Sequence, residues 1–481
     1  MNSWIVTISL SLVCAFTVPS AAQQIETPKL PSTDAGQRVV AYIKAFNSGD
    51  EQEMRAFISA NVSEDALRRR SIDERLQIYK EMLANMKSFE LNRVIEDSSS
   101  SVTGLFRSGN GEWLEIGFQF EPESPHKLLG LRIKDSEPPS GVKAPSPTVG
   151  GPQSKMSEAE FLAAIEKRLN ELVGADQFSG SVLIAKNGKK IFQKAYGLAS
   201  KEYNVVNGVD TKFNLGSINK IFTQVAIGQL AEQGKLSFDD KLAKHLSDYP
   251  NRQAAERITI RQLLSMTSGV GDIFGARFEL LAKDKLRSLK DFVPLFANEP
   301  LLFEPGSKQQ YSNGGYVLLG AIIERLSGQS YYDYVQEHIF KVAGMENTDS
   351  YEADAVVPNL ASGYTREGNS SSSRRNNIYF RPARGSSAGG GYSTTSDLLK
   401  FTIAVQNEKL RIPDFRSTGS NTDAGRRGRE GLGIAGGAPG TNAILELNPE
   451  NGYTVIILSN YDPPSAETIG REFRQWIGRI K

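Results

Sequence analysis

The chain has 481 residues, which is too long for one small domain and predicts two domains with sizeable cores. Hydrophobic residues at 39% and charged residues at 23% are ordinary for a globular protein and exclude wholesale disorder or a polytopic membrane protein. The net charge is +1 and no long basic run breaks the balance, so nucleic acid is not an expected partner. One cysteine, Cys14, and three scattered histidines exclude a disulfide framework and a Cys/His zinc site.

An apolar segment opens the chain and predicts an export signal. It runs from Trp4 to Val18, is shorter than the roughly 20 residues that span a bilayer, and is followed by Ala21 and Ala22. We therefore expect residues 1–22 to be a cleaved signal peptide and the mature protein to be periplasmic or extracellular, without a stable membrane span. Because the segment has no preceding Lys or Arg, an uncleaved anchor is the alternative.

Residues 25–134 are predicted to form a small α+β accessory domain. Apolar residues with helical spacing come first, and strand-like runs follow. The helical faces lie at 39–46 and 72–83, the strands near 89–95, 113–120 and 128–133, and a hairpin turn at 108–111. This order weakly resembles the nuclear-transport-factor-like α+β cones that precede some exported bacterial hydrolases. We find no catalytic constellation in it, so a docking or pocket-bearing module and a plain spacer are both open.

A Pro/Gly/Ser-rich stretch at 135–156 predicts a linker, and residues 157–481 form the second predicted domain. It begins with a capping box, Ser157 with Glu160, ahead of a helix. Two hairpins lie near its two ends, with Asn-Gly turns, and a helix closes the chain. The hairpin strands are 180–186 with 190–196 and 443–447 with 453–459, and the closing helix passes through 473–477. We expect one antiparallel sheet built from both ends of the domain.

A serine and a lysine three residues apart are the first candidates for chemistry. If a helix starts at Ser217, Lys220 lies on the same face, so hydroxyl and amine can approach each other. An unperturbed lysine is protonated at neutral pH, but burial or a neighbouring cation lowers its pKa toward that of a base. The same spacing recurs at Ser124 and Lys127 around Pro125, so this pair alone is weak evidence.

Further motifs follow in a characteristic order. A Tyr-x-Asn sequence begins at Tyr311, just after the turn at 303–306. The other segments are 263–269 (Leu-Leu-Ser-Met-Thr-Ser-Gly), 340–345 and 386–397. Together they resemble the serine beta-lactamase and penicillin-recognising hydrolase family, especially its class C beta-lactamase, D-aminopeptidase and esterase branch, over most of residues 175–475. The resemblance implies an α+β fold, in which helices flank an antiparallel sheet and a mainly helical subdomain is added.

The resemblance also implies a role for each matching residue. Ser217 would be the acylated nucleophile, Lys220 would accept or relay its proton, and Tyr311 would protonate the leaving atom and activate water. Asn313 would position Lys220 and the substrate, while the backbone N–H groups of Ser217 and Gly437 would form the oxyanion hole. A phenol beside an ammonium is also expected to have a lowered pKa. No cofactor or metal is required.

The third family motif is where the chain departs. Residues 433–440 align with a segment that usually begins Gly-His-x-Gly-Gly or Lys-Thr-Gly, and Ile434 occupies the polar position. An isoleucine can neither support proton transfer nor bind a substrate carboxylate. Met266 likewise replaces a usual histidine, and 407–432 lacks a family strand, so an element is expected to be missing at the edge of the site. The polar stretch 369–377 is expected to be a solvated loop.

The sequence thus favours an exported serine hydrolase that cleaves an ester or small amide through an acyl-enzyme on Ser217. Neutral esters and small amides are preferred over penicillins because the cation expected at Ile434 is missing. The alternative is a catalytically impaired penicillin-binding-like protein that holds a cell-wall fragment or another ligand. The histidines, His126, His245 and His338, lie outside these motifs and do not make a Ser-His-Asp triad. The natural substrate, the oligomeric state and the role of the first domain stay open.

Overall fold

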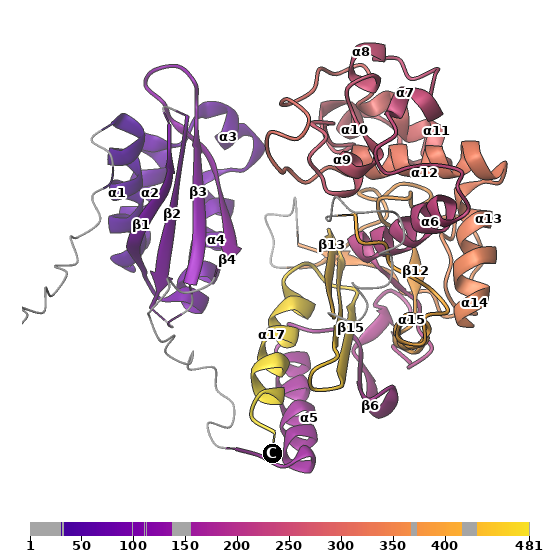
Figure 1. Cartoon of the computed structure of the whole chain (residues 1–481). Coiled ribbons are helices and arrows are strands. Elements are labelled where there is room, and N and C mark those ends of the chain that lie inside the picture. Colours follow the sequence, from indigo (N-terminus) through magenta and orange to yellow (C-terminus); the bar gives the residue numbers. More distant parts are fainter. Residues whose placement is uncertain are drawn as a thin grey trace, which may run out of the picture. The chain divides into compact units, whose positions relative to one another are not determined.

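The computed structural model describes residues 30, 33–98, 100–109, 111, 113–136, 155–366, 373–415 and 431–480. The chain divides into two compact units, Met1–Val149 and Gly150–Lys481 (Figure 1). The predicted signal peptide and most of the predicted linker lie outside the described residues. In the part of the chain that the structure describes, no helix is both long and apolar enough to cross a membrane.

Four helices and a four-stranded antiparallel sheet make up the first unit (Figure 1), with strand order β1-β2-β3-β4. The helices are α1 (Asp34–Asn47), α2 (Glu51–Asn61), α3 (Glu64–Arg69) and α4 (Ile72–Met86), and the strands are β1 (Phe89–Asp97), β2 (Ser101–Ser108), β3 (Trp113–Phe120) and β4 (Leu128–Asp135). Apolar side chains of helices and sheet form one core, in which the rings of Phe46 and Phe89 stack at 4.2 Å.

The two helical faces predicted in this unit are confirmed as α1 and α4, and the Ser71–Glu74 capping box fixes the start of α4. Strand β2 corrects the prediction, which omitted it. Gly104 and the serines at both ends interrupt its apolar pattern, yet it pairs with both β1 and β3. Its inward side chains, Val102 and Phe106, are buried, so tertiary pairing decides its conformation.

A five-stranded antiparallel sheet forms the centre of the second unit, with strand order β13-β14-β15-β5-β6. The strands are β5 (Gly180–Lys186), β6 (Lys189–Tyr196), β13 (Leu432–Ala438), β14 (Thr441–Asn448) and β15 (Tyr453–Ser459). The prediction of one sheet from both ends of the unit is confirmed. Asn187 and Gly188 adopt the positive φ values, 49° and 73°, that the tight β5–β6 turn requires.

Alternation along the strands sorts the side chains of this sheet into two cores. Val182, Ile184 and Val455 pack with helices α5 (Glu158–Gly174) and α17 (Ser465–Ile477) on one face. Leu183 and Ile456 point to the other face and join the core under α6 (Lys220–Glu232) and α15 (Thr395–Gln406). The capping box of α5, Ser157 with Glu160, is present as predicted. The sheet thus separates α5 and α17 from the helices that carry the candidate site.

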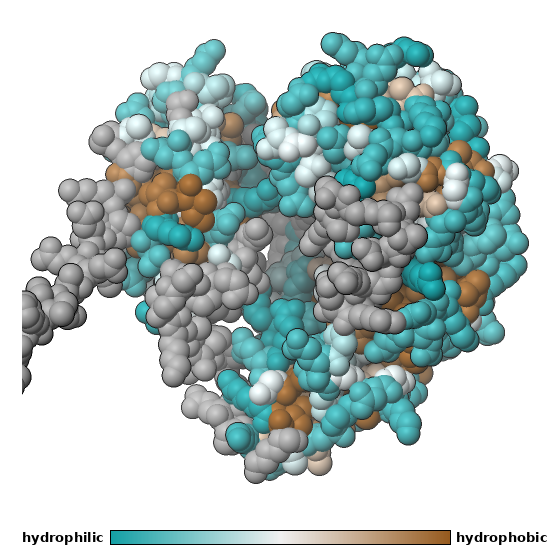
Figure 2. Space-filling view, in the orientation of Figure 1, coloured by the Kyte–Doolittle hydropathy of each residue, from teal (hydrophilic) through white to brown (hydrophobic). Residues whose placement is uncertain are grey.

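The rest of the second unit is mainly helical (Figure 1). Its helices are α7 (Leu242–His245), α8 (Arg252–Ala255), α9 (Ile260–Leu264), α10 (Ala276–Leu280), α11 (Leu289–Phe292), α12 (Asn313–Ser327), α13 (Tyr331–Val335) and α14 (Lys341–Ala343). Short strands are β7 (Leu198–Ser200), β8 (Val205–Val206), β9 (Phe213–Asn214), β10 (Tyr364–Thr365), β11 (Arg375–Asn376) and β12 (Tyr392–Ser393). Single turns are η1 (Gly216–Asn219), η2 (Lys283–Lys285), η3 (Val293–Leu295) and η4 (Gln336–Phe340). The face of this unit in Figure 2 is largely hydrophilic.

The two ends of the described part of the second unit meet. The backbone N–H of Met156 donates to the carbonyl of Arg479 at 3.1 Å, and Met156 forms a parallel bridge with Ile480. Met156 is itself 2% exposed and belongs to the α5–α17 core. The unit therefore closes on itself at this point.

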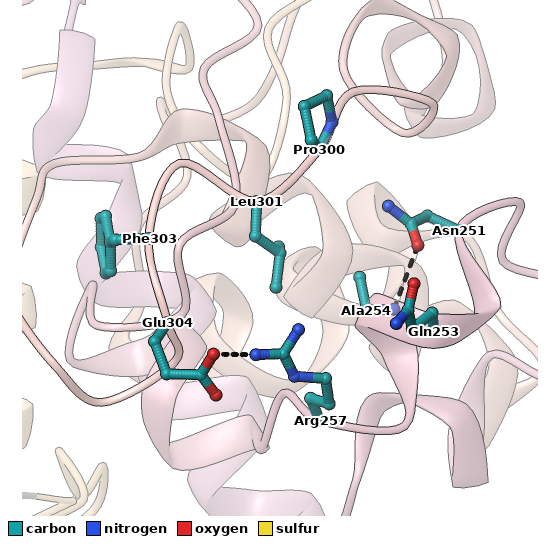
Figure 3. Close-up of a pocket in the computed structure, with 8 residues that line it drawn as sticks. All are labelled: Asn251, Gln253, Ala254, Arg257, Pro300, Leu301, Phe303 and Glu304. Carbon is teal, nitrogen blue, oxygen red and sulfur yellow. Dashed lines mark hydrogen bonds and ion pairs between the residues drawn. The ribbon is translucent and has the colours of Figure 1, made fainter.

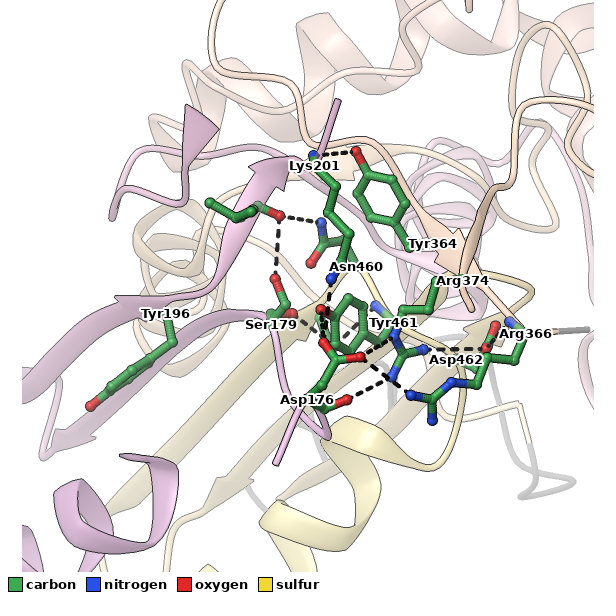
Figure 4. Close-up of polar contacts among 12 residues, drawn as sticks. Asp176, Ser179, Tyr196, Lys201, Tyr364, Arg366, Arg374, Asn460, Tyr461 and Asp462 are labelled. Atoms are coloured by element: carbon green, nitrogen blue, oxygen red, sulfur yellow. Dashed lines mark hydrogen bonds and ion pairs between the residues drawn. The ribbon is translucent and has the colours of Figure 1, made fainter. Parts of the chain in front are cut away.

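Residues 369–377 were predicted to form a solvated loop, and this is wrong for Arg374, which belongs to a cluster of charged side chains (Figure 4). Residues 369–372 lie outside the described part, but Arg374 is not solvated, because only 8% of its side chain is exposed. Its guanidinium lies 3.5 Å from the centroid of the Tyr461 ring and pairs with Asp176 and Asp462. Asp176 is 198 residues away along the chain, and local composition carries no sign of such a partner.

Candidate active site

Ser217 lies in the single turn η1 between β9 and α6. The α-helix begins at Lys220, so the prediction of a helix that starts at Ser217 is three residues early. Gly216 has φ +49°, and its N–H donates to the side chain of Asn214 at 2.9 Å, which fixes the tight entry into the turn. The serine hydroxyl is left partly exposed at the beginning of a largely buried helix.

The amine of Lys220 is buried beside this hydroxyl. Its Nζ lies 3.1 Å from Ser217 Oγ and 2.7 Å from Asn313 Oδ1, and it also donates to the carbonyl of Ala388. The residue is 5% exposed. Burial lowers the pKa of Lys220 to about 7, and the negative charge of Asp272 opposes part of that change. Much of this lysine is therefore neutral near pH 7.

The phenol of Tyr311 approaches Ser217 from the other side. Its oxygen lies 2.5 Å from Ser217 Oγ, and Lys220 Nζ lies 4.8 Å from the centroid of its ring. Burial raises the pKa of Tyr311, while the hydrogen bond with Ser217 works against that rise. The expectation of a lowered tyrosine pKa is therefore wrong. Desolvation disfavours the phenolate, and the nearby amine has lost much of its positive charge.

Asn313 is held between Lys220 and a carboxylate, Asp272, that none of the sequence motifs contains. Its Nδ2 lies 3.0 Å from both oxygens of Asp272, and its backbone N–H donates to Asp272 Oδ2 at 3.1 Å. Asp272 lies three residues after the 263–269 segment, between α9 and α10. An acidic residue shortly after that segment was the available signal, but nothing in the local sequence connects it with Asn313, 41 residues away.

Strand β13 lies against η1, where the resemblance predicts an oxyanion hole. A Cβ on Gly216 would come within 2.8 Å of the Gly437 nitrogen, and one on Gly436 would lie 2.0 Å from the Leu215 carbonyl oxygen. The backbone N–H groups of Ser217 and Gly437 thus belong to two segments in close contact. Ile434 lies on the same face of β13 as Gly436 and packs against the main core, so its position beside η1 is apolar.

The 386–397 segment is bound to the start of α6 by a series of hydrogen bonds. Asn219 Nδ2 donates to the carbonyl of Ser386 at 3.2 Å, and Thr223 Oγ1 donates to the carbonyl of Ser387 at 2.7 Å. The bond from Lys220 to the Ala388 carbonyl continues the series over three successive carbonyls. This segment fixes the orientation of Lys220.

Met266 and the histidines take no part in these contacts. Met266 has φ +60°, packs against the main core, and accepts the Gln310 N–H at its carbonyl at 2.9 Å. His245 is paired with Asp240 at 2.9 Å, at the end of α7. The other two, His126 in the first unit and His338 in η4, also lie outside the cluster around Ser217.

The pocket in Figure 3 is a separate feature of the helical part. It has a volume of about 350 Å³, and Arg257 and Glu304 point toward each other across it as an ion pair. Its lining residues are Asn251, Gln253, Ala254, Arg257, Pro300, Leu301, Phe303 and Glu304. None of them is a serine, lysine or tyrosine of the candidate site. Within the described ranges, no group of three His, Cys, Asp or Glu side chains could hold a metal ion.

Comparison with known proteins agrees with this geometry. The beta-lactamase family model matches residues 163–477. Penicillin-binding protein 4* of Bacillus subtilis (strain 168) is 30% identical over 337 residues, which are 64% of this chain and 72% of that protein. The crystal structure of a penicillin-binding protein from Bacillus halodurans has 30% identity and a TM-score of 0.56, and the match covers 63% of this chain and 98% of that one.

A D-amino acid amidase from Ochrobactrum anthropi SV3 shares the fold at 23% identity and a TM-score of 0.54, over 66% of this chain and 97% of that chain. The family match begins at residue 163, so the resemblance of the first unit to nuclear-transport-factor-like cones stays a prediction. The second unit combines the family match with a serine, a lysine and a tyrosine in mutual contact. The chain belongs to the beta-lactamase family and is a serine hydrolase.

Proposed function

We propose that this protein is an exported hydrolase that cleaves a neutral ester or small amide through an acyl-enzyme on Ser217. The observation that carries the proposal is the position of Ser217 Oγ, which contacts Lys220 Nζ at 3.1 Å and Tyr311 OH at 2.5 Å. A serine hydroxyl needs an adjacent base to become a nucleophile, and both of its neighbours handle protons. Export is supported by the apolar segment at residues 4–18.

The hydrogen bonds of Lys220 support its role as the base. A neutral amine has two N–H groups and one lone pair. Asn313 Oδ1 and the Ala388 carbonyl only accept hydrogen bonds, so they take the two N–H groups. The lone pair is left for the hydroxyl hydrogen of Ser217. Since burial brings the pKa of Lys220 to about 7, the neutral form is available at physiological pH.

The proposed reaction then follows in two halves. Ser217 Oγ bonds to the substrate carbonyl carbon while its proton moves to Lys220, and the N–H groups of Ser217 and Gly437 stabilise the oxyanion. The bond to the leaving group breaks as Tyr311 donates its proton to the leaving atom. The proton that Lys220 took from Ser217 then passes to the phenol oxygen of Tyr311, which restores both groups. In the second half, the phenol proton of Tyr311 moves to Lys220, the phenol oxygen takes a proton from water, and the water oxygen bonds to the acyl carbon. The bond to Ser217 Oγ then breaks as Lys220 gives its proton back to the serine, and the acid is released.

Ile434 supports a preference for uncharged substrates. Family members commonly carry His or Lys at this place, whereas here an apolar side chain packs against the core beside η1. A substrate carboxylate brought to this position would lose hydration without gaining a cation. We therefore expect neutral esters and small amides to be cleaved better than penicillins or cephalosporins.

Serine-reactive labelling tests the proposal directly. The full chain is incubated with a fluorescent fluorophosphonate and, separately, with a short-chain nitrophenyl ester. Ser217→Ala should abolish both labelling and hydrolysis, whereas Ser124→Ala, which alters the other Ser-x-x-Lys sequence, should leave both unchanged. Undiminished turnover by Ser217→Ala would remove the assignment of the nucleophile.

The second candidate is a binding protein that keeps the family fold without turnover. The apolar environment of Ile434 favours it, because the third motif is altered. A parent protein that neither reacts with the fluorophosphonate nor hydrolyses esters, yet binds cell-wall fragments in calorimetry, would establish this alternative.

A further inference from the structure

Asp272 brings two loops and a helix together at one carboxylate. Its Oδ1 accepts the backbone N–H of Phe274 at 3.0 Å, and its Oδ2 accepts the backbone N–H of Asn313 at 3.1 Å. Both oxygens lie 3.0 Å from Asn313 Nδ2. The neighbouring Gly271 carbonyl accepts the hydroxyl of Ser312 at 2.9 Å. This segment is thereby fixed to the start of α12, which carries Asn313.

These contacts determine which end of the Asn313 amide faces Lys220. A carboxylate only accepts hydrogen bonds, so the NH₂ group of Asn313 must point toward Asp272. The amide oxygen then points toward Lys220, at 2.7 Å from Nζ. A reversed amide would offer Lys220 a donor instead of an acceptor, and the amine would have to turn its lone pair away from Ser217.

We propose that Asp272 is a positioning residue for Lys220, on which it acts through the orientation of the Asn313 amide and through its own negative charge. The proposal rests on the proposed function, in which Lys220 is the base. Asp272 does not contact the serine or the phenol. It determines the direction of the Lys220 lone pair and the pH at which the Lys220 ammonium loses the proton that occupies this lone pair.

The groups around Lys220 give the charge of Asp272 its effect. Ser217 faces the amine from η1, the Ala388 carbonyl faces it from the segment before β12, and the rings of Tyr311 and Tyr316 lie 4.8 and 5.5 Å from Nζ. The negative charge of Asp272 favours the protonated amine and raises the Lys220 pKa against the larger effect of burial. Removing this charge must lower that pKa further.

The test measures kcat and KM for the nitrophenyl ester between pH 5 and 9. In the parent, kcat/KM should rise with an inflection near pH 7 as Lys220 loses its proton. Asp272→Asn should move the inflection to lower pH by about one unit, because the loss of a nearby opposite charge lowers the pKa of an amine by roughly that much. It should also lower the plateau kcat about tenfold with little change in KM, because Asn313 is no longer held in one orientation.

A matched control and a double variant separate this role from a structural one. Asp291→Asn removes a carboxylate that accepts three hydrogen bonds from Arg287 and Ser288 at the start of α11, so it should lower thermal stability without moving the inflection. In an Asn313→Ala background, Asp272→Asn should still move the inflection but should cost little further kcat. A full tenfold additional loss in that background would overturn the action through Asn313.

The remaining outcomes are equally decisive. An Asp272→Asn protein with the parent's inflection and plateau overturns the proposal. If that variant does not fold, Asp272→Glu carries the test: it keeps the charge, so its inflection should match the parent's, and an inflection moved by a unit contradicts the proposal. A parent protein that is itself inactive and unlabelled refutes the proposed function instead, so the two failures are distinguishable.

Discussion

Lys220 Nζ lies 4.8 Å from the centroid of the Tyr311 ring, so the amine beside the nucleophile also faces the π surface of the phenol. The two groups act on Ser217 from different directions, and their replacements should have different effects. The ring face is independent of the hydroxyl, which allows a substitution that deletes only the proton donor.

Tyr311→Phe and Lys220→Met should each lower kcat by roughly 10²-fold or more, the scale of positioned acid–base groups. Tyr311→Phe keeps the ring under Lys220, so the inflection of kcat/KM near pH 7 should remain. Lys220→Met should remove that inflection. Rates measured from pH 5 to 9 check both expectations. A loss confined to KM would make either residue a binding group instead.

The buried lysine should also control how stability depends on pH. The folded-state pKa of Lys220 is depressed from 10.5 to about 7, so the unfolded chain binds more protons between these two values. Folding stability attributable to Lys220 must therefore rise as the pH increases from 7 to 10.5, by up to about 5 kcal/mol. The free energy of unfolding of the parent, relative to that of Lys220→Met, should increase as the pH rises through this window. Urea titrations at pH 7 and 9.5 measure the difference, and parallel pH profiles would contradict it.

Two glycines of β13 provide a matched pair of substitutions. A Cβ on Gly436 would lie 2.0 Å from the Leu215 oxygen and 2.8 Å from the Ser217 nitrogen, and both are backbone atoms that cannot move independently. Gly436→Ala should push η1 and β13 apart and lower kcat by about 10²-fold, as expected for a displacement near 1 Å at a reacting group. Gly433→Ala meets no atom within 4 Å and should keep the parent's activity. Equal activity of both variants would show that β13 does not hold Ser217.

Ile434 offers a test of substrate preference. Ile434→His or Ile434→Lys should add a donor for a substrate carboxylate and raise kcat/KM for a penicillin about ten- to a hundredfold, as a charge-assisted hydrogen bond of roughly 1.5 to 3 kcal/mol predicts. Activity on the neutral ester should change less. Because a newly buried cation without a partner destabilises a strand, thermal stability must be measured with the rates. Efficient penicillin turnover by the parent would refute the expected preference.

The fold of the second unit could be predicted because its signals are local. Asn-Gly turns, short continuous apolar runs and the Ser157 capping box all act within a few residues. Strand β2 could not be predicted, since its glycine and serines give a weak pattern and its neighbours β1 and β3 stabilise it. A family strand was expected to be missing from 407–432, and residues 416–430 of that stretch lie outside the described residues.

In the site, motif order predicted Ser217, Lys220, Tyr311 and Asn313, and the structure brings their side chains together. Their roles stay predictions. Asp272 could not be predicted as a site residue, because its role depends on a contact with Asn313, 41 residues away in the sequence. The raised pKa of Tyr311 could not be predicted either, because desolvation depends on burial in the folded protein and not on spacing along the chain.

Because Met156 contacts Arg479, the polypeptide enters and leaves the hydrolase unit at the same point on its surface. A neighbouring domain attached at either end would be tethered to the same spot, with α5 and α17 and the whole sheet between that spot and α6. The unit should therefore tolerate insertion into a loop of another protein. It should also tolerate circular permutation, in which a short linker joins the present ends and new ends are made in another loop. Neither change would separate β5 from β15.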